Sequence, residues 1–135
     1  WLSIVNFYTK KLDYQKALNY IEKATEIDAD NALYWTKYAS INRRLNFIEE
    51  CEYGYRRAIE LGNYELATWI NRCDVLITLG EIDTAISNVE NGLEFYPHEV
   101  ELQYRLAGLY LKKGETIKGK FYLQNALKSN TEYVI

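Results

Sequence analysis

The stretch Arg72-Cys73-Asp74 contains residue types that could support nucleophilic chemistry. A thiol beside a guanidinium group can have a lowered pKa, because the positive charge stabilises the reactive thiolate. A catalytic cysteine also needs a base, and the chain has one histidine, His98, which follows Pro97 in a turn-forming stretch. Whether Cys73 is a nucleophile or a packing residue therefore depends on the element that positions it.

The composition excludes several classes of function. The 135 residues carry a net charge of -3, from 16 basic and 19 acidic residues mixed along the chain, so no basic stripe points to nucleic acid. No apolar stretch approaches the ~20 residues that span a bilayer. Two cysteines and one histidine cannot form a structural zinc site, and there is no glycine-rich phosphate loop. No cofactor or metal site is predicted, carboxylate pairs such as Glu49-Glu50 are interpreted as solvated, and the chain is not predicted to be an enzyme. A cytoplasmic location is the default expectation.

The chain repeats with a period of 34 residues. Trp1, Trp35 and Trp69 are each 34 positions apart, and the next step falls on Gln103. Small residues are required where two helices cross closely, and a stack of helix pairs repeats that crossing in every unit. Three columns of mostly small residues keep this register: Ala17, Cys51, Ala85 and Gly119; Ala24, Ala58, Gly92 and Ala126; and Val5, Ala39, Cys73 and Ala107.

Each unit predicts two amphipathic helices with a break between them. In the third unit, apolar or small residues recur at i, i+4 and i+7 from Trp69 and again from Ala85. Asn46, Gly80 and Gly114 occupy the column where the first helix should end, and these residue types tolerate the left-handed conformation of a helix C-terminus. We therefore expect a tight turn at this column.

Two further features concern the ends of the helices. Leu12 occupies the same column in the first unit and weakens the predicted stop there, because leucine disfavours the left-handed conformation. Loops between units are predicted at four turn-forming stretches: Asp28 to Asn31, Gly62-Asn63, Tyr96-Pro97 and Ser129 to Thr131.

This pattern resembles the tetratricopeptide repeat, whose 34-residue unit carries Trp, Leu-Gly, Tyr, Ala, a large apolar residue, Ala and a loop Pro. The match in the third unit is at Trp69, Gly80, Ala85, Gly92, Leu93 and Pro97, and in the fourth at Leu106, Ala107, Tyr110, Gly114, Leu123, Ala126 and Leu127. Asn42 in place of Tyr and Arg72 in place of Leu depart from it and put the local packing in doubt. The half-a-TPR variant of RNA-processing scaffolds is the alternative that "WTKYA" with "YRRAIE" suggests, but the regular 34-residue step favours the ordinary form.

The resemblance covers the chain as four units and implies its fold. The units are residues 1–31, 32–65, 66–99 and 100–133, with 134–135 as the start of a further repeat. The implied fold is an all-α solenoid, a right-handed superhelix of antiparallel helix pairs, in which the first helices line a concave groove. Because the chain lacks methionine and Trp1 falls inside an expected helix, we expect it to be a fragment of a longer protein.

The resemblance implies a protein-protein interaction module that binds a peptide or partner protein in this groove. The positions that line it are Leu2, Ser3, Asn6, Leu33, Thr36, Lys37, Ser40, Ala67, Ile70, Asn71, Asp74, Glu101, Tyr104, Arg105 and Gly108, with Arg43 and Arg44 at the rim. Asn6, Lys37, Ser40, Ile70, Asn71, Asp74, Tyr104 and Arg105 are the candidate binding residues. An amide such as that of Asn71 can both donate to and accept from a peptide backbone. Lys37 and Arg105 would select acidic groups.

Two alternatives define the limits of this hypothesis. Some family members hold the carboxylate tails of chaperones with a Lys, Asn, Asn, Lys, Arg clamp, but here Asn71 and Arg105 are the best match and Glu101 stands where a Lys is needed, so chaperone tails are disfavoured. The array could instead be structural, packing on its parent chain or self-associating through apolar ends. In either case Cys73 and Cys51 fall in small columns, which predicts that both are buried packing residues and not nucleophiles.

Overall fold

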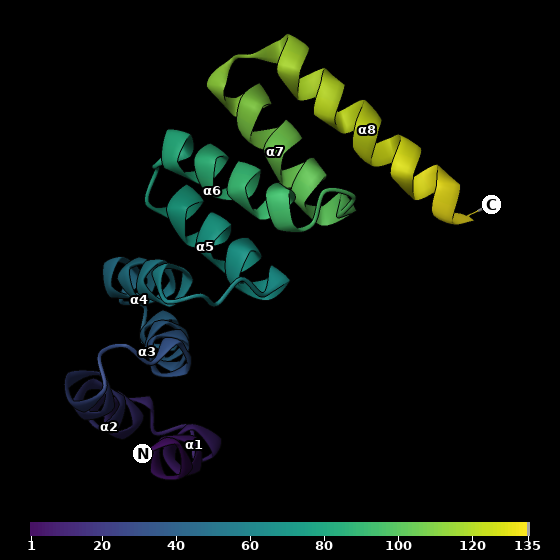
Figure 1. Cartoon of the computed structure of the whole chain (residues 1–135). Coiled ribbons are helices and arrows are strands. Elements are labelled where there is room, and N and C mark those ends of the chain that lie inside the picture. Colours follow the sequence, from purple (N-terminus) through teal and green to yellow (C-terminus); the bar gives the residue numbers. More distant parts are fainter. Residues whose placement is uncertain (135) are drawn as a thin grey trace. The chain divides into compact units, whose positions relative to one another are not determined.

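The structure is a computed structural model that describes the backbone of residues 1–134 and the side chains of residues 1–128. The described residues form eight α-helices and no strand, which confirms the all-α prediction (Figure 1). None of these helices is long and apolar enough to cross a bilayer. The helices are α1 (Leu2–Lys10), α2 (Tyr14–Ile27), α3 (Ala32–Arg44), α4 (Ile48–Glu60), α5 (Leu66–Thr78), α6 (Ile82–Phe95), α7 (Val100–Lys113) and α8 (Thr116–Val134).

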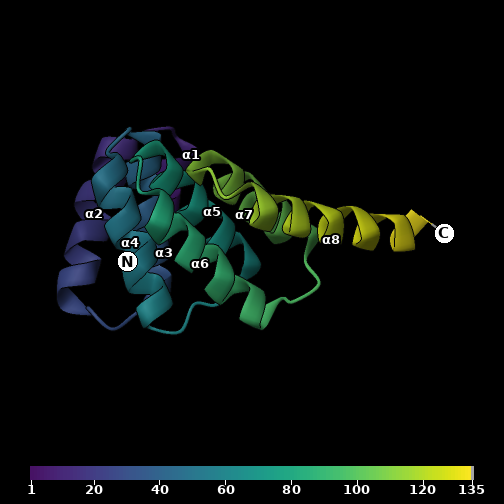
Figure 2. The same cartoon turned by 90° about the horizontal axis from the view of Figure 1, so that it is seen from above.

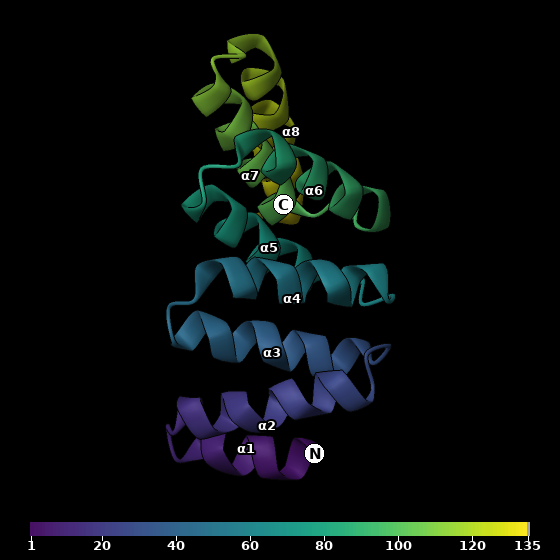
Figure 3. The same cartoon turned by 90° about the vertical axis from the view of Figure 1, so that its left-hand side faces the viewer.

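The chain divides into two compact units, residues 1–68 and the part from Trp69 onward. In the first unit α1 packs on α2, α2 on α3 and α3 on α4, so that consecutive helices lie antiparallel in the order of the sequence (Figure 3). The apolar centre of α1, α2 and α3 is fully or almost fully buried, at Val5, Ala17, Ile21, Ala24 and Ile41.

The second unit repeats this arrangement. The indole ring of Trp69 on α5 stacks on the ring of Phe95 at the end of α6, with 5.8 Å between ring centroids. α6 packs on α7, and α7 packs on α8. α8 is longer than α7 and extends beyond it (Figure 2). Each unit is thus an array of antiparallel helix pairs.

The predicted turn at Ser129 to Thr131 is wrong, because α8 continues through Val134. The segment contains neither glycine nor proline, and each Ser, Asn or Thr costs a helix only about 0.5 kcal/mol relative to alanine. Nothing in the sequence therefore forces the helix to end there. The further repeat predicted at 134–135 is not tested, since Val134 is the last residue of α8 and Ile135 lies outside the described residues.

The columns of small residues lie at the helix crossings. All twelve positions are buried, and most have no exposed surface. At Gly92 a Cβ atom would lie 3.1 Å from Cγ of Trp69, so α5 and α6 approach as closely as the small residue allows. The prediction that these columns bring the helices together is confirmed.

The break inside each pair uses the left-handed conformation that the column predicts. Asn46, Gly80 and Gly114 have φ angles of 64°, 77° and 92°. Leu12 also adopts this conformation, with a φ angle of 61°, so the leucine does not weaken the stop as expected. α1 ends at Lys10 because the packing of α1 on α2 determines the turn. Leu12 therefore adopts the left-handed conformation despite its cost in free energy.

This strain at Leu12 predicts a stabilising substitution. A left-handed conformation costs an L-residue about 1–2 kcal/mol, whereas glycine adopts it freely, so Leu12→Gly should raise the free energy of unfolding by about 1 kcal/mol. The leucine side chain is 71% exposed and loses little packing when it is removed. Chemical denaturation followed by circular dichroism measures the change. Leu12→Ala is the matched control, because it removes the side chain and keeps the strain; an equal gain in both variants would contradict the prediction.

Candidate functional site

In the first unit the candidate binding residues lie on α1 and α3. Asn6 and Ser40 are exposed, and Lys37 is half-buried. α1 and α3 contain no Asp or Glu, and the ammonium group of Lys37 has no ion-pair partner among the described residues. These first helices therefore present a positive charge that no described acidic side chain pairs with.

Thr36, another predicted groove position, forms hydrogen bonds within the protein. Its hydroxyl group accepts a hydrogen bond of 2.8 Å from Nδ2 of Asn63 and donates one of 2.9 Å to the carbonyl group of Ala32. Asn63 also accepts from the backbone N–H of Glu65 at 3.1 Å. Thr36 thus holds the loop that leads into α5, and both hydrogen-bonding functions of its hydroxyl group are used.

In the second unit, two candidate residues that are 31 positions apart form an ion pair. Nη1 of Arg105 on α7 donates to Asp74 on α5, and Nη2 of Arg105 lies 2.9 Å from Oε1 of Glu101. Desolvation lowers the pKa of the Arg105 guanidinium, but the two carboxylates outweigh it and the pKa is raised. The three side chains carry a net charge of -1. This differs from the expectation that Arg105 offers its positive charge to an acidic ligand.

The remaining candidates of the second unit are on the same two helices. Ile70 and Asn71 belong to α5 and Tyr104 belongs to α7, and all three side chains are partly exposed. Together with the ion pair they form a mixed surface of apolar, amide, phenol and charged groups. Such a surface can contact both the side chains and the backbone of an extended peptide.

The two cysteines have the opposite character to a catalytic thiol. Cys51 and Cys73 are free thiols with no exposed surface. Burial raises the pKa of Cys51 to about 11. Burial also raises the pKa of Cys73, although Arg105 acts in the other direction. The prediction that both are packing residues is confirmed, and His98 is exposed in the loop between α6 and α7.

Slow thiol chemistry should follow from this burial. A pKa raised from 9.0 to about 11 lowers the thiolate fraction of Cys51 by about 100-fold at about pH 8. We expect Ellman's reagent to label neither thiol rapidly in the native protein, and both in concentrated guanidinium chloride. Because the folded pKa is raised, the contribution of the Cys51 thiol to stability is complete below pH 9.0 and is lost as the pH rises through about 11. Labelling of one native thiol at the denatured rate would contradict the assigned faces.

Buried asparagines are the residues that the sequence pattern missed. Asn88 on α6 is 1% exposed; its Nδ2 donates to the Trp69 carbonyl at 3.0 Å, and its Oδ1 accepts from Nη1 of Arg72 at 3.3 Å. Asn42 is also 1% exposed and donates to the Tyr38 carbonyl at 2.8 Å. The unusual Asn42 and Arg72 are therefore hydrogen-bonded, and the doubt about packing there is removed.

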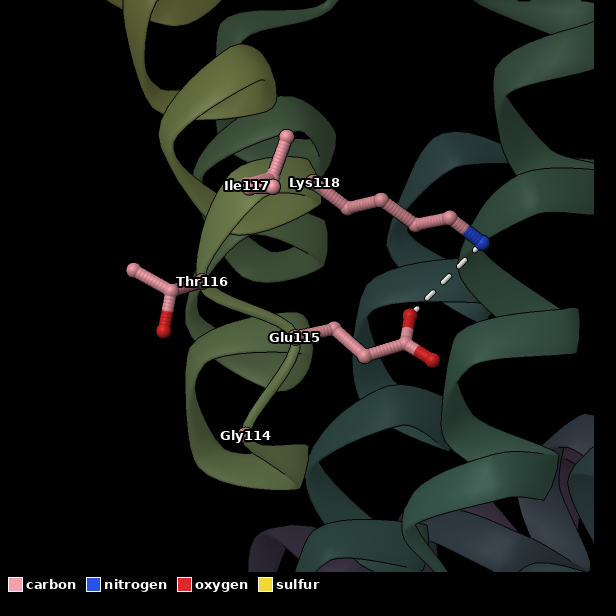
Figure 4. Close-up of a pocket in the computed structure, with 5 residues that line it drawn as sticks. All are labelled: Gly114, Glu115, Thr116, Ile117 and Lys118. Carbon is pink, nitrogen blue, oxygen red and sulfur yellow. Dashed lines mark ion pairs between the residues drawn. The ribbon is translucent and has the colours of Figure 1, made fainter.

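Apolar side chains are exposed on α1, the first helix of the first unit, and on α8, the last helix of the second unit. Ile117 is 87% and Phe121 is 55% exposed on α8, and Phe7 is 53% exposed on α1. Figure 4 shows the residues that line a hollow at the α7–α8 turn, where Thr116 points away from the neighbouring helices and Ile117 lies in front of the α8 ribbon. Glu115 and Lys118 point the other way and form an ion pair of 3.6 Å.

Known proteins match this chain in sequence. The family model described as "Tetratricopeptide repeat" matches residues 1–31 and 100–133. Serine/threonine-protein phosphatase 5 of Homo sapiens is 28% identical over 105 residues, which is 74% of this chain and 20% of the phosphatase. The Rattus norvegicus enzyme is 27% identical over the same length and shares. The chain thus spans about a fifth of the length of these curated relatives.

Solved structures match in fold. The crystal structure of MamA superposes with a TM-score of 0.85 at 20% identity, covering 98% of this chain and 78% of that one. MamA residues 41 to the end from Desulfovibrio magneticus RS-1 superpose with a TM-score of 0.80 at 15% identity, covering 96% and 73%. At these identities the likeness concerns the fold of stacked helix pairs.

Proposed function

Because the chain is a tetratricopeptide-repeat protein, we propose that it binds an extended peptide segment of a partner protein on the exposed faces of its first helices. The observation that supports this most directly is the ion pair between Asp74 and Arg105. It joins two candidate residues from successive first helices, so α5 and α7 present one continuous surface. Binding of protein segments is a general use of stacked helical repeats.

The charges of the two units favour different parts of such a peptide. The first helices of the first unit have no acidic residue, and Lys37 has no ion-pair partner in the described part of the chain, so this face suits an acidic side chain. In the second unit Arg105 is neutralised by Asp74 and Glu101, so recognition there rests on Asn71, which suits a peptide backbone. The chaperone-tail clamp remains disfavoured, because it needs free cations where this unit places an ion pair.

Peptide selection against the whole chain tests the proposal. Peptides enriched from a displayed random library are synthesised, and their dissociation constants are measured by isothermal titration calorimetry. Lys37→Ala and Asn71→Ala should each weaken binding by about tenfold, as expected for the loss of one or two hydrogen bonds to the ligand. Lys23→Ala on α2 is the control and should leave the affinity unchanged. Selected peptides that bind both groove variants as tightly as the wild type would refute the groove assignment.

A second candidate function is self-association without a groove ligand, supported by the exposed apolar residues of α1 and α8. Ile117 and Phe121 form one exposed strip on α8, and apolar strips of this kind often mark contacts between proteins. Sedimentation velocity over a range of concentrations tests it. A sedimentation coefficient that rises with concentration, and that returns to the monomer value in Ile117→Glu, would support this function.

A further inference from the structure

A polar cleft of about 410 Å³ lies in the second unit, away from the candidate binding residues. α6, the loop after it, α7 and α8 all contribute to its lining, and the polar part consists of Glu90, Glu94, Gln103 and Asn125, with the ring of Tyr122 beside them. Gln103 and Leu106 line it from α7, whereas the groove positions of α7 are Glu101, Tyr104, Arg105 and Gly108. The cleft therefore uses a different side of α7.

Gln103 gives the cleft its distinctive chemistry. Its side chain is 8% exposed, and its Nε2 donates to the Pro97 carbonyl at 3.2 Å. A carbonyl group can only accept, so this bond fixes the nitrogen and leaves Oε1 of Gln103 as the remaining polar atom. Oε1 is buried and has no hydrogen-bond partner among the described residues. A buried acceptor without a donor destabilises the protein, and a ligand that brings a donor would remove this cost.

The cleft also reflects the 34-residue register. Gln103 stands where the other three units have Trp1, Trp35 and Trp69. In the preceding pair the Trp69 indole is 3% exposed and fills the space between α5 and α6 by stacking on Phe95. The side chain of Gln103 is smaller than an indole ring, and the cleft lies beside it where a tryptophan would place its ring.

The charges around the cleft all favour a cation. Glu90 and Glu94 are exposed carboxylates, α6 contains no basic residue, and among the described side chains no lysine or arginine lines the cleft. Glu90 accepts from the Tyr110 hydroxyl group at 3.3 Å. On α8, Lys118 lies over the Tyr110 ring at 5.3 Å and pairs with Glu115. The lining thus supplies acceptors and no competing positive charge.

We propose that this cleft binds a primary alkylammonium group, with Glu90 and Glu94 providing the charge, Gln103 Oε1 and Asn125 accepting hydrogen bonds, and Tyr122 contacting the alkyl chain. An ammonium group has three donors and no acceptor, which matches this lining. Gln103 lines the cleft, and Oε1 is the polar atom of its side chain that the hydrogen bond to Pro97 leaves available. The site is independent of the proposed peptide-binding function, because it shares no residue with that surface.

The test is a titration of the ¹⁵N-labelled whole chain with n-butylammonium chloride at constant ionic strength, followed by NMR. We expect saturable shifts of the Gln103 and Asn125 side-chain amides, with a dissociation constant of about 1–10 mM, which is realistic for so small a ligand. n-Butanol has the same alkyl chain without the charge, and tetramethylammonium has the charge without donors. Both should bind at least about tenfold more weakly, as expected when a charged hydrogen bond is lost.

Substitutions in the chain locate the site. Gln103→Trp restores the residue of the other units and fills the cleft, so saturable shifts should disappear. Gln103→Leu is the alternative if the tryptophan variant does not fold, because it replaces the amide with an apolar side chain of similar volume and so removes the acceptor. Glu94→Gln should weaken binding by about 1.5-fold to fivefold, which is the usual range for one exposed charge pair. Glu26→Gln on α2 is the control and should leave the titration unchanged.

Two further probes distinguish the source of the ammonium group. Tighter binding of Nα-acetyl-lysine methylamide than of 1,5-diaminopentane identifies a lysine side chain of a peptide, and the reverse order identifies a free diamine. Either order supports the proposed chemistry. Shifts that rise linearly without saturation, equal binding of n-butanol, or full binding to both Gln103→Leu and Glu94→Gln would overturn it.

Discussion

Replacing Gly54 by alanine is expected to lower the free energy of unfolding by about 2 kcal/mol. A Cβ atom at this position would lie 2.8 Å from the Cβ atom of Ala39 and 2.9 Å from its backbone nitrogen. A backbone atom cannot move away without shifting α3 against α4, and such overpacking costs about 1–3 kcal/mol or more. The gain in helix propensity from glycine to alanine, about 1 kcal/mol, recovers only part of this cost. Denaturation by guanidinium chloride measures the difference.

Gly108 provides the matched control for this experiment. It also lies inside a helix, α7, but it is exposed and a Cβ atom there would meet no heavy atom within 4 Å. Gly108→Ala should therefore gain the full propensity term and stabilise the protein by about 1 kcal/mol. The same substitution thus has opposite signs at two helical glycines. A gain at both positions would mean that α3 and α4 are farther apart than the structure places them.

The column that contains Gly54 shows how much of the packing could be found in the sequence. Tyr20, Gly54, Asn88 and Tyr122 are 34 residues apart. Twelve residues before each stand Tyr8, Asn42, Leu76 and Tyr110. Where both positions hold tyrosine, the rings stack at 5.6 Å for Tyr8 and Tyr20 and at 5.7 Å for Tyr110 and Tyr122. The residue types in the two columns therefore change together from unit to unit. A comparison of the two columns in the 34-residue register would have indicated that their side chains are in contact.

The burial of the small columns could be predicted from residue size, because a helix crossing has room for small residues only. Other features could not be obtained from the 34-residue register. The pairing of Arg105 with Asp74 depends on side-chain rotamers across two helices, which residue type alone does not determine. The left-handed Leu12 is a case in which packing outweighs a local preference of about 1–2 kcal/mol. The fold is thus more predictable than the free or paired state of the charges on its surface.

Asn88→Ala is expected to destabilise the protein by about 3 kcal/mol, the sum of two lost hydrogen bonds and a cavity. Asn88 is 1% exposed, and its amide is the link that ties the Trp69 carbonyl of α5 to α6. It also accepts from Arg72, whose guanidinium group would lose this acceptor. Because a charged donor is involved, the penalty is larger than for a neutral pair. Chemical denaturation followed by circular dichroism measures the loss.

Two variants separate the hydrogen bonds of Asn88 from its volume and its helix propensity. Asn91→Ala makes the same substitution at an exposed position of α6 and should be neutral or stabilising by about 0.5 kcal/mol, which is the difference in propensity alone. Asn88→Leu keeps the volume and removes both hydrogen bonds, and it should still lose about 2 kcal/mol, because the Arg72 donor is left without this partner. If Asn88→Leu were as stable as the wild type, packing alone would hold α5 against α6. A loss of unfolding free energy in Asn88→Leu with none in Asn91→Ala would show instead that the hydrogen bonds of the buried Asn88 amide hold α5 against α6. This amide stands at the position where the pairs of α1 with α2 and of α7 with α8 have stacked tyrosines.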